Sequence, residues 1–320
     1  MAYVFGPIAS RRLGVSLGVD LVPPKTCPLD CVYCEAGRTT NLTRERYECV
    51  PADEVIRELD AVLCKHPKLD FVTFSGSGEP TLNSRIGDVV RFVKTKYPEY
   101  PLCLLTNAML FGDETLIRDI ADVDLVVPSL DGSDAEEFLK INRPAAGFDF
   151  ERFVADLTRY TLNTRSRVNL ELFIVPGVND SDASIARFAS LIRAMRVDLV
   201  QLNTLDRPGV EAFVTPSTPE NTHRFIAALS PFVPVEAVGV FRYRAPKPGC
   251  TFSVTESQQR ILELIRRRPA TLPDLALALQ QSEAEVGKLL DQLFAAGKVG
   301  IQKQQRGNFY LPPPEESKSE

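Results

Sequence analysis

The sequence of 320 residues contains no unbroken apolar stretch of about 18 residues, so we expect no membrane-spanning helix. Residues 1–7 lack the basic stretch and apolar run of a secretory signal peptide. Positive charge is not in excess, because the net charge is -5. The sequence therefore gives no reason to expect avid binding to nucleic acid or to an anionic membrane. Solenoid-type repeats are also absent. A hydrophobic content of 44% and a charged content of 25% are typical of a soluble globular protein.

The seven cysteines are an odd number, and three of them cluster, which argues for a reducing compartment rather than export. We therefore expect a cytoplasmic protein. Cys64 and Cys103 lie in a helical and a strand pattern and are expected in the core. Cys49 and Cys250 fall in predicted loops, where the alternatives are an inert thiol or a ligand of a second metal cluster.

The clustered cysteines, Cys27, Cys31 and Cys34, occupy eight residues. Neighbouring thiols on one short loop cannot all form disulfides with good geometry, and three ligands leave a tetrahedral zinc site one ligand short. Three thiolates on one loop suit a cubane iron–sulfur cluster, whose fourth iron is then open to an external ligand. A zinc site completed by a distant Cys49 or His66 is the alternative.

Strand and helix patterns alternate along most of the chain. The expected strands are 15–22, 71–75, 102–107, 125–130, 170–175 and 199–203. Helical patterns begin at residue 51 and continue over 86–93, 114–120, 135–141, 150–160 and 183–195. Six alternations predict an α/β fold of parallel strands with right-handed crossovers. In such folds, catalytic groups come from loops after the carboxyl ends of the strands.

A second candidate site follows the second expected strand: Gly76, Ser77, Gly78, Glu79 and Pro80. Glycine lets the backbone approach a ligand closely, and a carboxylate accepts hydrogen bonds from an ammonium group. Alone, this segment is a weak loop signal. Its position after a strand and behind the cysteines makes it a candidate ligand-binding loop.

The cysteine spacing, with Tyr33 before the last cysteine, resembles the signature of the radical S-adenosylmethionine (SAM) superfamily. The resemblance implies a partial (βα)6 TIM-like barrel and a [4Fe-4S] cluster held by Cys27, Cys31 and Cys34. SAM would chelate the open iron through its amino and carboxylate groups. A reduced cluster would then cleave SAM to methionine and a 5′-deoxyadenosyl radical, which abstracts hydrogen from a substrate. The electron would come from a donor such as flavodoxin or ferredoxin.

The same resemblance implies SAM contacts for other residues. Residues 76–80 are similar to the Gly-Gly-Glu-Pro motif that receives the methionine amino group, with Ser77 replacing the first glycine. Tyr33 and Ile174 would border adenine, with core packing as the alternative. Asn107 and Ser129 would meet the ribose or carboxylate, with strand-end capping as the alternative.

Lys140-Ile-Asn-Arg-Pro144 contains Asn142 and Arg143, which we expect to bind SAM or an anionic substrate; a plain salt bridge is the alternative for the arginine. Together with the segments 10–14 and 37–40, it resembles iron–sulfur oxidoreductases related to the wyosine-base-forming enzymes of tRNA. The relatives that act on tRNA carry further cysteines near the N-terminus, and this chain has none before Cys27. The substrate therefore stays open between a small molecule, a peptide and RNA.

We expect the barrel over 1–245, a linker at 246–254, a small domain at 255–312 and a disordered tail at 313–320. Three helical patterns and a hairpin in the small domain are similar to a winged-helix module, which raises the alternative of an iron–sulfur-dependent DNA-binding regulator. Its third helix begins with Ser282-Glu-Ala-Glu285, so two carboxylates lie where DNA phosphates would be. This charge argues against duplex DNA as a partner.

Overall fold

The computed structural model describes residues 3–10, 12–238, 254–279, 281–304 and 307–313. The linker expected at 246–254, apart from its last residue, lies outside these residues. So do Cys250 and residues 314–320 of the expected tail. These expectations stay predictions.

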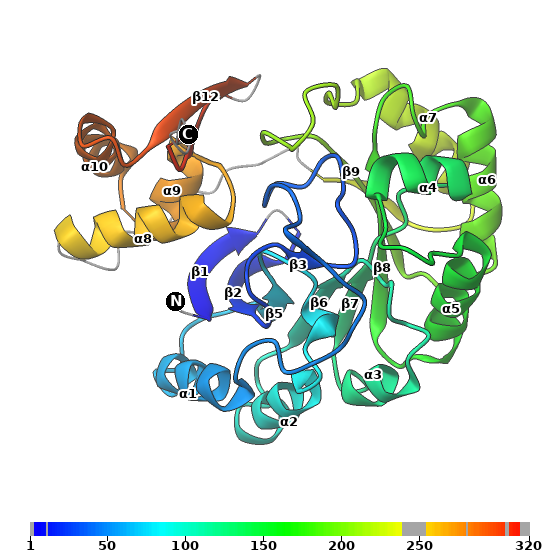
Figure 1. The fold of residues 1–320 in the computed structure, drawn as a ribbon, viewed down its shortest axis with the longest axis horizontal. Coiled ribbons are helices and arrows are strands. Elements are labelled where there is room, and N and C mark those ends of the chain that lie inside the picture. The colour runs from blue at the N-terminus through cyan, green and yellow to red at the C-terminus, as the bar shows by residue number, and fades with distance from the viewer. Residues whose placement is uncertain (1–2, 11, 239–253, 280, 305–306, 314–320) are drawn as a thin grey trace, which may run out of the picture.

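Within the described residues, an eight-stranded sheet with the order β1-β2-β5-β6-β7-β8-β9-β10 forms the larger part of the molecule (Figure 1). Its strands are β1 (Val4–Ser10), β2 (Gly14–Asp20), β5 (Phe71–Ser75), β6 (Leu102–Thr106), β7 (Leu125–Pro128), β8 (Arg167–Ile174), β9 (Leu199–Thr204) and β10 (Val235–Ala237). β1 is antiparallel to β2, and every later neighbouring pair is parallel. The expected α/β fold with a partial, TIM-like barrel is confirmed.

Helices connect the parallel strands and lie outside the curved sheet (Figure 1). They are α1 (Ala52–Leu63), α2 (Ile86–Lys96), α3 (Glu114–Asp119), α4 (Ala135–Asn142), α5 (Phe150–Asn163), α6 (Asp182–Arg193) and α7 (Pro219–Leu229). The helices α3 to α7 each begin after a side chain that accepts a first-turn backbone N–H: Asp113, Asp134, Asp149, Ser181 and Thr218. These caps fix where each helix starts after its loop.

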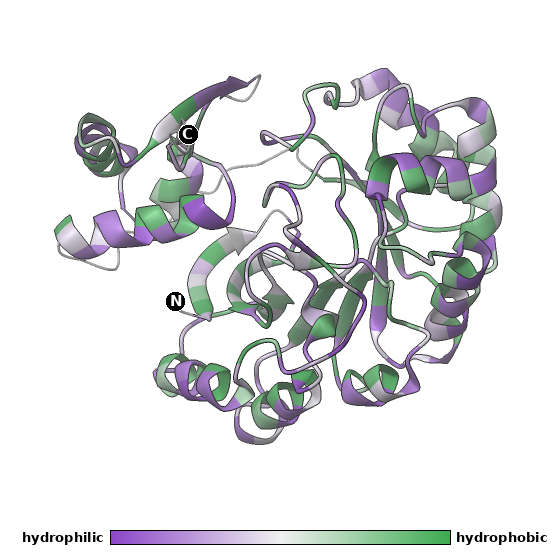
Figure 2. Ribbon diagram, in the orientation of Figure 1, coloured by the Kyte–Doolittle hydropathy of each residue, from purple (hydrophilic) through white to green (hydrophobic). Residues whose placement is uncertain are grey.

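The two faces of the sheet differ in polarity. Alternate strand residues such as Val72, Phe74 and Leu170 are fully buried against the helices, and Figure 2 shows hydrophobic residues on the inner sides of those helices. Burying each such side chain stabilises the fold by roughly 1.5–3 kcal/mol. The concave face also carries polar groups, including the Ser16 and Thr73 hydroxyls, whose oxygens lie 2.6 Å apart. The inside of the barrel is therefore suited to a polar ligand.

The two outermost strands of the large sheet, β1 and β10, and the helix α7 were not predicted from the sequence. The pairing of β1 is irregular, because Gly6 has φ +99° and the register shifts between Phe5 and Ile8. β10 has only three residues. The strand expected at 15–22 is also corrected, since β2 ends at Asp20.

One expected core residue is also corrected. Cys64 is exposed, because it is the C-cap of α1 and lies beyond the helix's buried stripe. Cys103 is fully buried, as expected. The thiol of Cys103 has a pKa raised to about 12 by burial.

The C-terminal part lies beside β1 (Figure 1), with α9 packed against that strand. Its elements are α8 (Val254–Arg267), β11 (Ala270–Thr271), α9 (Leu272–Leu279), α10 (Glu283–Ala295), β12 (Gly300–Gln304) and β13 (Gly307–Leu311). The strands form an antiparallel sheet with the order β11-β13-β12. A separate apolar cluster, which includes Ile261, Leu275 and Leu290, fills the space between the helices. None of the helices in the described ranges combines the length and hydrophobicity needed to cross a membrane.

Candidate cofactor site

The cysteine loop follows the carboxyl end of β2 and begins in a short parallel pair, β3 (Thr26–Cys27) and β4 (Asn41–Leu42). The segment 141–145, after the fourth parallel strand, holds the loop by backbone hydrogen bonds. The N–H of Val32 donates to the carbonyl of Ile141 at 2.9 Å, and the N–H of Ala145 donates to the carbonyl of Pro28 at 2.9 Å. The Lys-Ile-Asn-Arg-Pro segment is thus a backbone support of the cysteine loop, a contact that the sequence did not reveal.

The three thiols of this loop influence one another electrostatically. Burial is the main cause that raises the pKa of Cys27, Cys31 and Cys34, and the charges of Cys27 and Cys34 add to the rise at Cys31. Half-buried thiols that raise one another's pKa need compensating positive charge to ionise together. The irons of a cluster bound by thiolates supply such charge, so this donor set fits an iron–sulfur cluster.

Two asparagine side chains donate to these sulfurs. Asn107 Nδ2 lies 3.4 Å from Cys27 Sγ, and Asn142 Nδ2 lies 3.4 Å from Cys31 Sγ. Hydrogen bonds to ligand sulfurs tune the reduction potential of an iron–sulfur cluster. The SAM contacts expected for both asparagines stay predictions, and the amide–thiol contacts were not predicted from the sequence.

The alternative zinc ligands make other contacts. The Cys49 thiol donates to the Tyr47 carbonyl at 3.3 Å, and His66 Nδ1 lies 3.4 Å from Glu99. In the part of the chain that the structure describes, no three His, Cys, Asp or Glu side chains converge as ligands of a single metal ion.

The Gly76–Pro80 loop lies against the start of the cysteine loop. The N–H of Lys25 donates to the Ser77 carbonyl at 2.6 Å, and the N–H of Glu79 donates to the Thr26 carbonyl at 3.0 Å. A Cβ on Gly78 would lie 2.7 Å from Val22 Cγ2 and still closer to the Thr26 carbonyl oxygen. Glycine at this position therefore permits the two loops to touch.

Glu79 is buried and ties the end of β5 to the end of β6. Its Oε1 accepts from the Thr81 and Thr106 hydroxyls at 2.6 Å each, and its Oε2 accepts from the N–H of Asn107 at 2.8 Å. Burial raises the pKa of this carboxyl group although these donors act in the opposite direction. Pro80 then begins the short 3-10 helix η1 (Pro80–Leu82).

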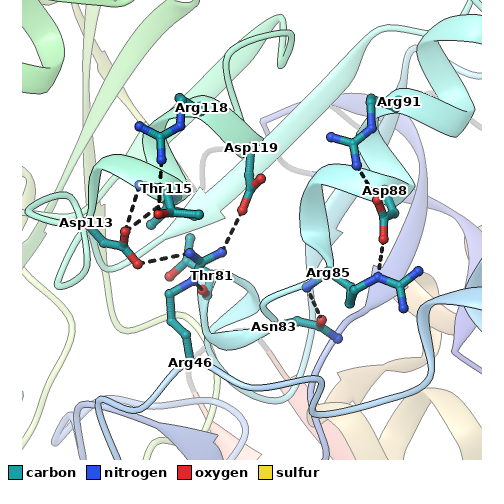
Figure 3. Close-up of polar contacts among 11 residues, drawn as sticks. Arg46, Thr81, Asn83, Arg85, Asp88, Arg91, Asp113, Thr115, Arg118 and Asp119 are labelled. Atoms are coloured by element: carbon teal, nitrogen blue, oxygen red, sulfur yellow. Dashed lines mark hydrogen bonds and ion pairs between the residues drawn. The ribbon is translucent and has the colours of Figure 1, made fainter.

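Arg46 fixes this 3-10 helix from outside, as Figure 3 shows. Its Nε donates to the Thr81 carbonyl at 3.0 Å, and its two terminal nitrogens each lie 3.0 Å from a carboxylate of Asp113 or Asp119. One guanidinium group thus joins the segment after the glycine loop to both ends of α3. Sequence reasoning missed this residue, because no motif marks an arginine whose partners come from another βα unit.

Asp131, which was not predicted, links the aromatic side of the site to the cysteines. Its Oδ2 accepts from the Tyr33 hydroxyl at 2.5 Å and from Asn142 Nδ2 at 2.8 Å. The Tyr33 ring stacks on Phe173, with ring centroids 3.8 Å apart. Asn142 Oδ1 is buried and accepts no hydrogen bond from the residues the structure describes, so an acceptor beside the thiols is available to a ligand.

The other predicted residues have distinct surroundings. Arg143 Nη1 lies 2.6 Å from Glu211 Oε1, which is the salt-bridge alternative. The N–H of Ser129 donates to the Thr106 carbonyl at 3.0 Å. Ile174 is buried at the end of β8 and lines a cavity of about 320 Å³ that also reaches Gln304 of β12.

Comparison with known proteins places this site in a family. Residues 21–189, more than half of the chain, match the model of the radical SAM superfamily. The UPF0026 protein MJ1312 of Methanocaldococcus jannaschii is 30% identical over 235 residues, which are 73% of each chain. The GTPase Obg of Brachyspira hyodysenteriae is 31% identical over 300 residues, which are 92% of this chain but only 43% of that protein.

A solved structure shows the same fold. The radical SAM methyltransferase from Sphaerobacter thermophilus superposes with a TM-score of 0.58 at 22% identity, over 69% of this chain and 65% of that one. Residues 21–189, which match the family model, contain the three cysteines, the glycine loop and most of the parallel strands. The chain therefore belongs to the radical SAM superfamily, as an iron–sulfur enzyme that uses SAM.

Proposed function

We propose that Cys27, Cys31 and Cys34 hold the [4Fe-4S] cluster and that the loop 76–80 holds SAM next to it. Bound together, the cluster and SAM supply a 5′-deoxyadenosyl radical for hydrogen abstraction. The observation that carries this proposal is the backbone contact between the two loops, in which Glu79 N–H donates to the Thr26 carbonyl next to Cys27. Through this contact a glycine-bearing turn lies against the start of the cysteine loop, at the carboxyl ends of neighbouring strands, which supports the proposal.

The side chains around the two loops suit the polar groups of SAM. Glu79 Oε2 accepts one backbone N–H, and a carboxylate oxygen has a second lone pair that can accept from an ammonium group. Asn142 Oδ1 offers a second acceptor. The half-buried ring of Tyr33, stacked on Phe173, forms an aromatic wall on which a purine can pack. Ser129 and Ile174, at the ends of the next strands, complete the proposed pocket.

For the substrate, we propose the cavity of about 320 Å³ at the carboxyl ends of β8 and β9. Its wall combines apolar groups such as Ile174 and Leu205 with hydrogen-bonding groups such as Asn203 and His223. A small cavity with a mixed wall favours a small molecule over a peptide. The wyosine-type reaction on tRNA is the competing proposal, and the assay below includes it.

The C-terminal part, in this proposal, is a winged-helix module that closes the cavity through Gln304. Its third helix, α10, begins with a capping box: the Ser282 side chain accepts from the N–H of Glu285, and the Glu285 carboxylate accepts from the N–H of Ser282. Glu283 adds a second carboxylate to the same turn. Two acidic groups at the turn that would enter a DNA groove oppose contact with phosphates. We therefore propose that the module serves the enzyme and that the protein is not a DNA-binding regulator.

The test is anaerobic reconstitution with iron and sulfide, followed by SAM and dithionite in place of flavodoxin or ferredoxin. We expect 5′-deoxyadenosine by chromatography and mass spectrometry, and none from the Cys31→Ala variant. An intact cluster that yields no 5′-deoxyadenosine contradicts the proposal. Addition of unmodified tRNA separates the two substrate classes, since only the RNA reaction raises turnover and leaves altered nucleosides in a digest.

A further inference from the structure

A buried arginine connects the C-terminal part with the glycine loop of the barrel. Arg267 ends α8, and its side chain is only 7% exposed. Its Nε donates to Asp20 Oδ2 at 3.0 Å, and its guanidinium carbon lies 4.3 Å from the Phe5 ring centroid. Asp20 is the last residue of β2, so the arginine reaches from the small part of the molecule to the carboxyl edge of the sheet.

The Asp20 carboxylate also contacts the loop 76–80. Its other oxygen, Oδ1, accepts from the N–H of Ser77 at 3.3 Å. Gly76 has φ +121°, and a Cβ at that position would collide with the same carboxylate oxygen. One carboxylate therefore touches Arg267 with one oxygen and the backbone of the glycine loop with the other.

A second buried arginine makes a similar connection to the cysteine loop. Arg207, in the segment after β9, is 4% exposed. Its Nη1 lies 3.0 Å from Asp274 Oδ2 and 2.5 Å from the Pro269 carbonyl oxygen, and both partners belong to the C-terminal part. Its Nε lies 3.4 Å from Glu35 Oε2, and Glu35 directly follows Cys34.

Neither connection is needed to hold the C-terminal part together, because that part has an apolar core of its own. A buried guanidinium group is costly unless carboxylates and carbonyls surround it. Arg267 finds one such partner in its own helix, the Glu263 carbonyl at 3.3 Å from Nη1, and another in Asp20 of the barrel. Arg207 finds partners both in the C-terminal part and in Glu35 of the cysteine loop. The contact surface thus contains two charged groups, and each joins the C-terminal part to a residue that lies in or contacts one of the two loops: Asp20 for Arg267 and Glu35 for Arg207.

We propose that the C-terminal part positions the cofactor site: Arg267 holds the Ser77 amide in place through Asp20, and Arg207 holds the end of the cysteine loop through Glu35. Arg267, Asp20 and Arg207 are positioning residues in this proposal, which rests on the proposed role of the loop 76–80 in binding SAM. Docking of the C-terminal part then sets how tightly SAM binds, besides stabilising the fold.

The test uses the full-length reconstituted chain and three variants: Arg267→Met, Arg267→Lys and Asp20→Asn. The measurements are the SAM dissociation constant by anaerobic equilibrium dialysis, the iron content, and the change in the electron paramagnetic resonance signal of the reduced cluster when SAM is added. We expect Arg267→Met to weaken SAM binding about tenfold, which is the effect of losing one charge-assisted hydrogen bond. Arg267→Lys keeps the charge and should recover part of the affinity. Arg266→Met, on an exposed position of the same helix, is the matched control and should bind SAM like the wild type.

The double variant Arg267→Met with Asp20→Asn distinguishes positioning from general stabilisation. If Arg267 acts through Asp20, the double variant binds SAM no more weakly than the weaker single variant, whereas independent effects multiply. SAM affinity within twofold of the wild type in folded, iron-loaded Arg267→Met overturns the inference. A wild-type protein that binds the cluster but no SAM overturns the proposed function instead, so the two failures are distinguishable.

Arg207 has a separate readout, because it acts on the cysteine loop. We expect Arg207→Met to release iron to a chelator several-fold faster than the wild type, since Glu35 beside Cys34 then loses its buried partner. An unchanged rate of iron release in a folded variant removes Arg207 from the proposal.

Discussion

Substitution of Gly78 by alanine tests most directly whether the two cofactor loops are pressed together. The added Cβ would lie 2.7 Å from Val22 Cγ2 and closer still to the Thr26 carbonyl oxygen. Side chains can rotate away, but a backbone carbonyl cannot. Either the glycine loop or the start of the cysteine loop must therefore move, and the 3.0 Å hydrogen bond from Glu79 N–H to Thr26 then lengthens or breaks.

Overpacking of a close contact costs about 1–3 kcal/mol. If the shift affects only the bound state, the same free energy weakens SAM binding by roughly five- to 150-fold, at about 1.4 kcal/mol per factor of ten. If the shift is already present in the free protein, it lowers the free energy of unfolding instead. The sum of the two losses should fall in this range.

Anaerobic equilibrium dialysis gives the SAM affinity, and urea unfolding of the same preparation gives the stability. The matched control is Gly287→Ala, because Gly287 lies inside α10 and no heavy atom is within 4 Å of its Cβ position. That control should leave SAM binding unchanged and stabilise the helix by about 0.5–1 kcal/mol. Wild-type affinity and wild-type stability in Gly78→Ala would refute the reasoning about the loop contact.

Three further predictions concern individual side chains. Arg46→Met should lower the free energy of unfolding in urea by about 1–3 kcal/mol, since it removes the donor to the Thr81 carbonyl and the positive charge between the Asp113 and Asp119 carboxylates. Exposed Arg118→Met, as control, should change it by less than about 0.5 kcal/mol. Glu79→Gln replaces one carboxylate oxygen with an NH₂ group, which cannot accept the hydrogen bond that this oxygen accepts in the wild type. The variant should therefore have a lower thermal unfolding temperature than the wild type, measured on the cluster-free protein. An unchanged temperature argues against the connection that Glu79 makes between the ends of β5 and β6. In native protein, iodoacetamide should modify exposed Cys64 but not Cys103, because the Cys103 thiol is buried and has a pKa of about 12. Mass spectrometry of tryptic peptides measures the labelling of each cysteine, and rapid labelling of Cys103 contradicts the prediction.

The surroundings of some predicted residues could not be read from the sequence. Asn142 and Arg143 were predicted to bind SAM or an anionic substrate, and this stays a prediction; the structure adds that their segment supports the cysteine loop by backbone hydrogen bonds and that Arg143 pairs with Glu211. The sequence shows that a polar segment follows a strand. It does not show which way each side chain points when the segment crosses to a neighbouring loop.

The amino-acid sequence by itself determined the alternation of strands and helices, because the apolar period that forms each element is local. It also determined that three thiols and a glycine-bearing loop follow the first two parallel strands, since the spacing of Cys27, Cys31 and Cys34 is a local property. Only the tertiary structure decided which distant groups surround them. Arg267 meets Asp20 across 247 residues, and Asp131 meets Tyr33 across 98, so neither partner can be found without the closed arrangement of the chain.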